Sequence, residues 1–305
     1  METHTILGAN GNIGIHLAKI LPSSSRQIRL SSRNPQKINS EDKLVPADLL
    51  KAEEVNDAIL GTHVAYLVAG LPYATKTWKS QWPIVMKNVI DACAAHHAKL
   101  VFFDNMYAYD HNYVGDLHED TPMAPSSEKG KVRAEIAQML MEAVEKGKIQ
   151  AMIVRAAGFY GPKATQSFLN ISVIERMKVG KKAQWLYEKD KRQSFTYIPD
   201  AAKATAFLAQ QADAWDQIWH LPTDGTFPTV QEIVNFLSKE LNTSNKVQVL
   251  SPLMIQLLGA FIPVLREVKE LSYQMDRDFC FHSEKLQKKY GLAPTPINSG
   301  LLECL

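Results

Sequence analysis

The chain reads Thr5-Ile6-Leu7-Gly8-Ala9-Asn10-Gly11-Asn12-Ile13-Gly14 near its start, so an apolar strand ends in three glycines and a helix begins at once. In such a turn the first glycine permits the tight bend and the second lets backbone amides approach a pyrophosphate. The third lets the helix pack closely on the strand, and the helix N-terminus then faces the phosphate charge. The alternative is a purely structural turn. We favour a dinucleotide site, whose expected ligands within this run are Gly8, Asn10, Gly11, Asn12, Ile13 and Gly14.

The composition excludes several classes of partner. The 305 residues carry 34 basic and 32 acidic side chains without a basic stripe, which argues against nucleic acid. The first strand starts close to Met1, leaving no room for a signal peptide, and the apolar stretch Pro252–Leu265 is too short and interrupted to span a membrane. An odd number of scattered cysteines favours a reduced, cytoplasmic protein. We therefore expect a cytoplasmic monomer or homodimer with a small-molecule substrate, no nucleic acid and no membrane.

Short apolar runs alternate with helical patterns through the first 220 residues, as is typical of a parallel sheet wrapped by helices. The expected strands are Thr3–Leu7, Gln27–Ser31, Lys43–Val45, His63–Val68, Lys99–Phe103, Gln150–Val154, Ser194–Ile198 and Gln217–His220. The expected helices are Asn12–Leu21, Ala52–Leu60, Ser80–His96, Ser127–Lys146, Ser167–Met177, Pro199–Ala212, Thr229–Leu241, Pro252–Met275 and Ser283–Tyr290. The fold class is α/β, a Rossmann-type doubly wound parallel sheet with a smaller, mainly helical substrate-binding domain.

The alternation weakens after Gly161-Pro162, where the second domain is expected to begin. We predict an NAD(P)-binding Rossmann domain over residues 1–162 with 194–222. A cap domain over residues 163–193 with 223–305 is expected to cover the carboxyl ends of the strands, where open α/β sheets bind their ligands.

The sequence motifs, taken in their order along the chain, resemble those of the extended short-chain dehydrogenase/reductase family, which contains nucleotide-sugar epimerases and dehydratases. The resemblance covers nearly the whole chain. It rests on the glycine turn and on the runs Ala47-Asp48-Leu49, Val68-Ala69-Gly70, Val154-Arg155-Ala156-Ala157-Gly158-Phe159-Tyr160-Gly161-Pro162 and Ser194-Phe195-Thr196-Tyr197-Ile198-Pro199-Asp200. The last of these matches the strand that returns to the first domain in the family.

The resemblance implies that Asp48 and Leu49 flank the adenine of the cofactor and that Ala69 and Gly70 lie along it. Charge at the end of the second strand then indicates which cofactor is bound, because an acid there holds the ribose of NAD whereas an arginine accommodates the phosphate of NADP. The run Ser32-Arg33 contains no acid. Arg33 offers a planar fork and Ser32 a hydroxyl, so we expect NADP, with NAD as the alternative.

The family's catalytic positions are altered in this chain. The resemblance places Asn105 where a serine or threonine is usual, Lys129 at the catalytic tyrosine and Arg133 at the lysine four residues later. Trp82 stands where a helix asparagine is usual. Without the tyrosine, alcohol–ketone chemistry cannot be assigned by analogy.

Several groups could replace that tyrosine. Lys129 and Arg133 are four residues apart on one helical face, and their repulsion favours a neutral lysine able to act as acid or base; the alternative is a solvated Lys129 at a helix start. Arg133 could hold the cofactor ribose or an anionic substrate. Tyr107 and Tyr109 share a side with Asn105 only if the chain stays extended.

Tyr73 and Tyr160 are two weaker candidates for the group that replaces the tyrosine. The histidines show no metal-ligand spacing, so no metal is expected. Two functions stay open. One is an NAD(P)-dependent oxidoreductase or epimerase-like enzyme that moves a hydride between NADP(H) and a small carbonyl, alcohol or sugar-type substrate. The other is a non-catalytic NADP(H)-binding sensor or regulatory protein.

Overall fold

A computed structural model describes residues 1–22 and 24–305 of the chain. Its contacts divide the chain into two compact units. The first comprises residues 1–108, 129–155 and 201–219, and the second comprises residues 109–128, 156–200 and 220–305.

A seven-stranded sheet forms the centre of the first unit, in the order β10-β6-β5-β4-β1-β2-β3. The pairs of β1 with β2 and β4, of β2 with β3 and of β4 with β5 run parallel. From β3 to β6 this is the strand order of dinucleotide-binding doubly wound sheets. The strands are β1 (Glu2–Leu7), β2 (Arg26–Ser32), β3 (Lys43–Pro46), β4 (Val64–Leu67), β5 (Lys99–Asn105), β6 (Ala151–Ala156) and β10 (Ile218–His220). The fold class is confirmed, and seven of the eight expected strands form this sheet, with ends shifted by one or two residues.

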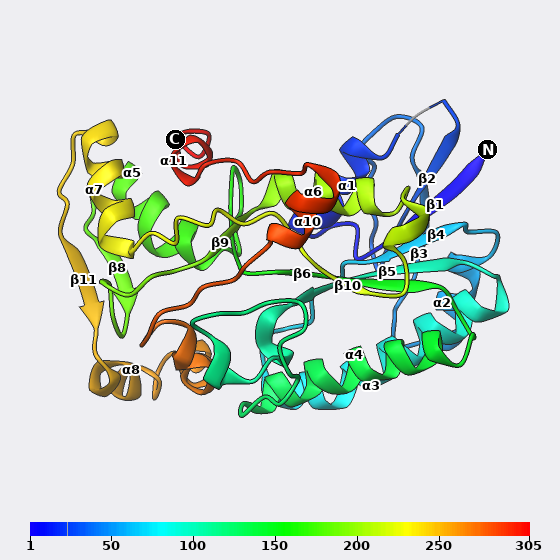
Figure 1. Ribbon diagram of the computed structural model, residues 1–305, viewed down its shortest axis with the longest axis horizontal. Coiled ribbons are helices and arrows are strands. Elements are labelled where there is room, and N and C mark those ends of the chain that lie inside the picture. The colour runs from blue at the N-terminus through cyan, green and yellow to red at the C-terminus, as the bar shows by residue number, and fades with distance from the viewer. Residues whose placement is uncertain (23) are drawn as a thin grey trace. The chain divides into compact units, whose positions relative to one another are not determined.

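Helices cover both faces of this sheet. They are α1 (Asn12–Ile20), α2 (Ala52–Ile59), α3 (Thr75–Ala95), α4 (Glu128–Glu145) and α6 (Ile198–Leu208), followed by the 3-10 turn η4 (Ala212–Ala214). Figure 1 shows α2, α3 and α4 on one side of the sheet and α1 and α6 on the other. A continuous apolar core lies between the sheet and α2, α3 and α4. It fixes where α3 and α4 begin relative to the strand ends, and therefore where Thr75 and Lys129 lie.

Four expected helices differ in extent. The helix expected over Pro199–Ala212 ends at Leu208, and the one expected over Ser167–Met177 consists of a π-helical turn over Asn170–Ile174 and a short α-helix over Glu175–Lys178. Helix α3 starts at Thr75 instead of Ser80 and continues through Pro83, because its buried stripe already begins at Trp78. The long helix expected over Pro252–Met275 is broken into three pieces, namely α8 (Pro252–Leu258), α9 (Pro263–Val268) and η5 (Lys269–Gln274). Pro263 stands at the first turn of α9, where its missing N–H cannot continue the preceding helix.

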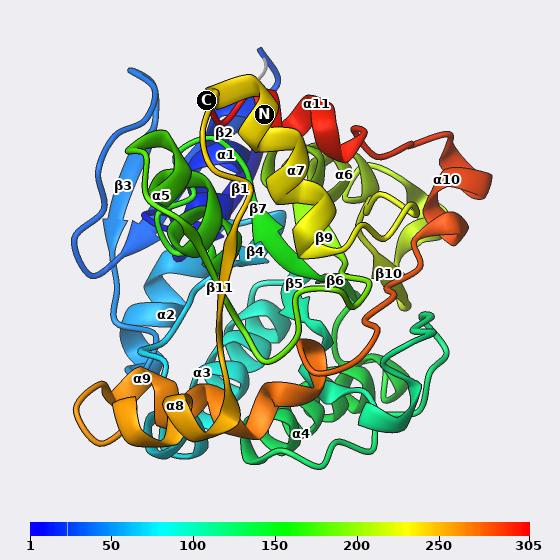
Figure 2. The same ribbon diagram turned by 90° about the vertical axis from the view of Figure 1, so that its left-hand side faces the viewer.

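The second unit combines short helices with two small sheets. Strand β7 (Gly158–Tyr160) pairs with β9 (Phe195–Tyr197), and β8 (Ala183–Leu186) pairs with β11 (Val247–Leu250), both in parallel. Figure 2 shows β11 leading from α7 at the top to α8 at the bottom. The remaining elements are η2 (His111–Tyr113), the π-helical turn η3 (Asn170–Ile174), α5 (Glu175–Lys178), α7 (Val230–Leu241), α10 (Glu284–Tyr290) and α11 (Ile297–Leu302). The sequence patterns missed the strands β7, β8 and β11 and the short helix α11. The three strands escaped detection because three or four residues carry too little alternation.

The compact units differ from the expected domains at four places, because residues 109–128, 156–162, 194–200 and 220–222 all belong to the second unit. Residues 109–128 belong to the second unit, because Leu117 forms a bridge with Phe281 there. Strand β9 was expected to join the large sheet, but it pairs with β7 instead. Among the described residues, no helix is both long and apolar enough to cross a membrane.

Candidate functional site

Two glycines of the first turn are required by close packing within the protein. Gly8 has φ +93°, and a Cβ there would lie 2.6 Å from the backbone nitrogen of Ala69. A Cβ on Gly14 would lie 2.7 Å from the carbonyl oxygen of Ala9. Both distances are shorter than real Cβ atoms tolerate, so glycine lets β1 approach the end of β4 and lets α1 pack on the turn. Gly70, in contrast, is exposed, and a Cβ there would touch no described atom.

Gly11 is not explained in this way. It is the exposed N-cap of α1, with an ordinary extended backbone at φ −77° and ψ 162°. A Cβ there would meet only the carbonyl oxygens of Gly8, at 3.4 Å, and Val68, at 4.0 Å. A side chain would instead stand in front of the first N–H groups of α1, which have no acceptor within the helix. These residues therefore fit the pyrophosphate of a dinucleotide.

The other expected ligands of the turn are distributed around α1. Asn10 is exposed, and its Nδ2 donates to the carbonyl oxygen of Asn34 at 2.9 Å, which ties the glycine turn to the loop after β2. Asn12 is half-buried at the first position of α1, and Ile13 is buried in the helix face that packs inward. Ile13 can therefore reach a ligand only through its backbone.

The end of β2 lies against the same turn. The backbone oxygen of Ser31 accepts a hydrogen bond from Gly8 N at 2.8 Å. The next residue, Ser32, has a buried hydroxyl that makes no hydrogen bond to any described residue, and Arg33 beside it is exposed. An unsatisfied hydroxyl next to an exposed guanidinium offers a donor pair to a ribose or phosphate.

Asp48 and Leu49 are held by neighbouring helices. Asp48 Oδ1 accepts from Leu50 N at 3.1 Å, and Asp48 N donates to Glu54 Oε2 at 2.7 Å, so this carboxylate orders the turn before α2. The carbonyl oxygen of Leu49 accepts from Asn88 Nδ2 at 3.0 Å. Asp48 thus has a structural role in the turn before α2, and its contact with adenine stays a prediction.

Lys129 is completely buried in the first turn of α4. Its Nζ donates to Thr75 Oγ1 at 2.8 Å and lies 4.8 Å from the centre of the Tyr73 ring. The alternative of a solvated lysine at a helix start is therefore wrong. Helix α3 begins at Thr75, so the residue at the family's tyrosine position is fixed against the start of the neighbouring helix.

Arg133 is buried in an ion cluster that the sequence analysis did not foresee. Its Nε lies 2.7 Å from Asp104 Oδ1, and Arg155 Nε lies 3.0 Å from Asp104 Oδ2. All three side chains are at most 4 % exposed. Because Asp104 compensates the charge of Arg133, the repulsion expected between Arg133 and Lys129 is weakened, and Arg133 points at an acid of the protein.

Aromatic rings enclose the same guanidinium. The Arg133 guanidinium lies 4.5 Å from the Trp82 ring centre, 4.9 Å from that of Phe102 and 5.8 Å from that of Trp78. Arginine stacks readily on aromatic faces. Trp82 and Arg133, both expected to stand at altered positions of the resembled family, contact each other in the structure.

Asn105, Tyr107 and Tyr109 do not share one face, because the chain stops being extended at Asn105. The 3-10 turn η1 (Met106–Ala108) follows, and Asn105 Oδ1 accepts from Tyr107 N at 2.9 Å. Tyr107 stacks on Trp78 in the first unit. Tyr109 lies in the second unit, buried, with its hydroxyl 2.6 Å from His220 Nε2.

The weaker candidate Tyr160 is also buried in the second unit, where Gly300 packs against its ring. Burial, followed by nearby Cys304 and Asp200, raises its pKa far above the ordinary tyrosine value. Tyr160 is therefore a packing residue that keeps its proton at neutral pH.

Sequence reasoning missed Asp104, Arg155 and Thr75. For the two charged residues a signal was available, because Asp104 follows a four-residue apolar run and Arg155 interrupts another. A charge inside a buried strand needs a partner, and that rule predicts an ion pair. Thr75 carries no such signal, since only the packing of α3 against α4 brings it to Lys129.

Comparison with known proteins agrees with this architecture. The model of the NAD dependent epimerase/dehydratase family matches residues 4–221. UDP-glucuronic acid 4-epimerase from Bacillus cereus, solved with NAD, is 18% identical with a TM-score of 0.79, covering 99% of this chain and 96% of that one. UDP-glucose 4-epimerase from Thermus thermophilus, also with NAD, is 15% identical with a TM-score of 0.78, covering 99% and 97%. MoeE5, solved with UDP-glucose and NAD, is 18% identical with a TM-score of 0.79, covering 100% and 97%. A search of curated proteins gave no match.

The strand order and the glycine turn between β1 and α1 define a Rossmann-type protein. More narrowly, because the family model spans more than two thirds of the sequence, the chain belongs to the NAD dependent epimerase/dehydratase family.

Proposed function

We propose that the chain binds NAD(P) at the glycine turn and moves a hydride between this cofactor and a small carbonyl, alcohol or sugar-type substrate. Gly11 carries the proposal, because neither its backbone angles nor its neighbours require glycine, whereas a dinucleotide in front of α1 would. Family membership supports it. Among the structures with similar folds, UDP-glucuronic acid 4-epimerase was solved with NAD and MoeE5 with UDP-glucose and NAD, which makes nucleotide sugars the first substrates to test.

Within this proposal Lys129 replaces the family's tyrosine as the proton donor and acceptor. When bound, the nicotinamide supplies or accepts the hydride, and the protein must move the matching proton. Lys129 Nζ lies 2.8 Å from the Thr75 hydroxyl, which gives the proton a second carrier on the neighbouring helix α3. Arg133 is tied to Asp104, so its part is to position α4.

The cofactor site is tested by Gly11→Ala. The added methyl group fits the extended backbone and the neighbours of Gly11, so the folded protein should keep its melting temperature. It should occupy the approach path of the pyrophosphate and weaken NADPH and NADH binding at least about tenfold, which corresponds to about 1.4 kcal/mol. Calorimetric titration measures both affinities.

The matched control is Gly225→Ala, because Gly225 is exposed and a Cβ there would meet no described atom within 4 Å. This variant should bind both cofactors as the parent does. Parent-like affinity in a folded Gly11→Ala protein would place the dinucleotide elsewhere.

Arg33 is proposed to favour NADP over NAD. Arg33→Ala should weaken NADPH binding by about 10- to 100-fold, because a charge-assisted hydrogen bond contributes about 1.5–3 kcal/mol. NADH affinity should stay constant. Lys37→Ala, an exposed cation in the same loop, is the control and should leave both affinities unchanged. Equal affinities of the parent for NADH and NADPH would contradict the preference.

A non-catalytic NADP(H) sensor is the second candidate. The complete burial of Lys129 and the pairing of Arg133 with Asp104 favour it, because both groups already have partners within the protein. A screen of aldehydes, ketones and nucleotide sugars by NADPH oxidation separates the two. Turnover of any of these substrates supports the enzyme, and tight NADPH binding without turnover supports the sensor.

A further inference from the structure

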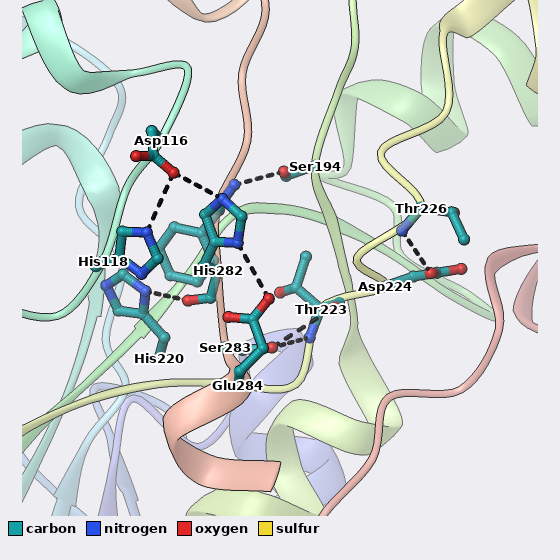
Figure 3. A network of polar contacts seen from close by, with 11 residues as sticks. Asp116, His118, Ser194, His220, Thr223, Asp224, Thr226, His282, Ser283 and Glu284 are labelled. Atoms are coloured by element: carbon teal, nitrogen blue, oxygen red, sulfur yellow. Dashed lines mark hydrogen bonds and ion pairs between the residues drawn. The ribbon is translucent and has the colours of Figure 1, made fainter. Parts of the chain in front are cut away.

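Two histidines and an aspartate of the second unit meet at one point (Figure 3). His118 Nε2 lies 3.1 Å and His282 Nε2 lies 3.0 Å from the same oxygen, Asp116 Oδ1. The two imidazole rings are stacked, with centres 4.4 Å apart and planes 8° from parallel. One ligand atom of each residue lies within 4.8 Å of the others. Both histidines therefore direct the same ring nitrogen to a shared acceptor.

Backbone pairing holds this cluster in place. Leu117 N donates to Cys280 O at 2.9 Å, and His282 N donates to Leu117 O at 2.9 Å, which forms the parallel bridge between Leu117 and Phe281. The side chains of Leu117 and Phe281 are fully buried. Asp116 and His118 flank one member of this anchored pair and His282 follows the other, so the backbone keeps the three side chains together. The two stacked rings must tilt out of parallel for both Nε2 atoms to face one ion.

His282 faces a carboxylate on each side of its ring. Its Nδ1 lies 3.1 Å from Glu284 Oε1, while its Nε2 points at Asp116. A neutral imidazole carries only one N–H, so it can donate to only one of the two acids. An imidazolium would donate to both acids. A metal cation at Nε2 is the other arrangement that suits both, because Nδ1–H can then donate to Glu284 while Nε2 and Asp116 act as ligands. An acid behind a ligating histidine is the usual way to fix its ring.

The spacing also suits a metal ion. In a tetrahedral site with ligands at about 2.0–2.1 Å, neighbouring ligand atoms are about 3.3 Å apart. The two nitrogen–oxygen distances of 3.0 and 3.1 Å are close to that value. Two imidazoles and one carboxylate are ligands that Zn²⁺ and related transition metals accept, with water in a fourth position.

We propose that Asp116, His118 and His282 bind a divalent transition metal ion of the zinc type, with Glu284 as the residue that orients His282. The ion joins the segment before α4 to the segment before α10 within the second unit. The sequence showed no metal-ligand spacing because the ligands come from two segments far apart in the chain.

Calorimetric titration of the metal-free full chain with Zn²⁺ tests the site. We expect one ion per chain and a raised melting temperature with Zn²⁺. The double variant His118→Ala/His282→Ala should lose both effects, and Glu284→Gln should bind about 10- to 100-fold more weakly. Asp116→Asn changes one of the three proposed ligands. Because Asp116 is exposed, this substitution should not disturb folding.

The matched control is His96→Ala/His97→Ala, which removes two imidazoles from a histidine-containing pocket of the first unit and should leave binding unchanged. Titration with Co²⁺ should give a spectrum without thiolate charge-transfer bands, which excludes Cys280 as a ligand. No binding by the parent, or equal binding by the parent and the His118→Ala/His282→Ala protein, would overturn the proposal.

Discussion

Asp104→Ala should destabilise the protein by about 3–5 kcal/mol, because it leaves the buried guanidinium groups of Arg133 and Arg155 without their shared carboxylate. The loss is far larger than the value of the ion pairs themselves, since buried cations cannot regain their hydration. Urea unfolding measures it as a lower midpoint at an unchanged slope.

Asp91→Ala is a matched control for this prediction. Asp91 also contacts two cations, Lys87 and Lys148, each at 2.6 Å, but its side chain is 42 % exposed. Removing it should cost at most about 1 kcal/mol, the usual range of surface ion pairs. Similar losses of unfolding free energy for Asp104→Ala and Asp91→Ala would show that burial does not increase the cost of removing Asp104.

Lys129→Met should reduce turnover by about 10²–10⁴-fold with little change in NADPH affinity, because it removes the proposed acid–base group. Methionine has a similar length and suits the buried position, so the variant should stay folded. The measurement is the rate of NADPH oxidation with the first substrate that the screen identifies. Lys129→Tyr restores the group usual in the resembled family and should recover activity.

Lys131→Met is the control here, since Lys131 is an exposed residue of the same helix, and it should turn over like the parent. Thr75→Val distinguishes a proton role from simple packing, because loss of the hydroxyl should change the pH profile of turnover with Lys129 still in place. A Lys129→Met enzyme as fast as the parent would make Lys129 a packing residue.

Much of the first unit could be predicted from local patterns. The glycine turn and the buried strands are encoded by neighbouring residues, since backbone conformation and apolar periodicity are local properties. Strands β7, β8 and β11 escaped detection because very short strands leave no periodic signal, whereas β9 was predicted as a strand and only its pairing with β7 was not foreseen. Asn105, Tyr107 and Tyr109 could share a face only if the chain stayed extended, and the 3-10 turn η1 ends that conformation.

The sequence by itself determined the Rossmann class and the place of the glycine turn between β1 and α1, because these depend on residue type and spacing. Only the tertiary structure decided which charges meet. Asp104 joins Arg133 to Arg155, and His118 meets His282. The partner of a buried or converging polar side chain depends on which distant segments the topology brings together, and no local pattern encodes that choice.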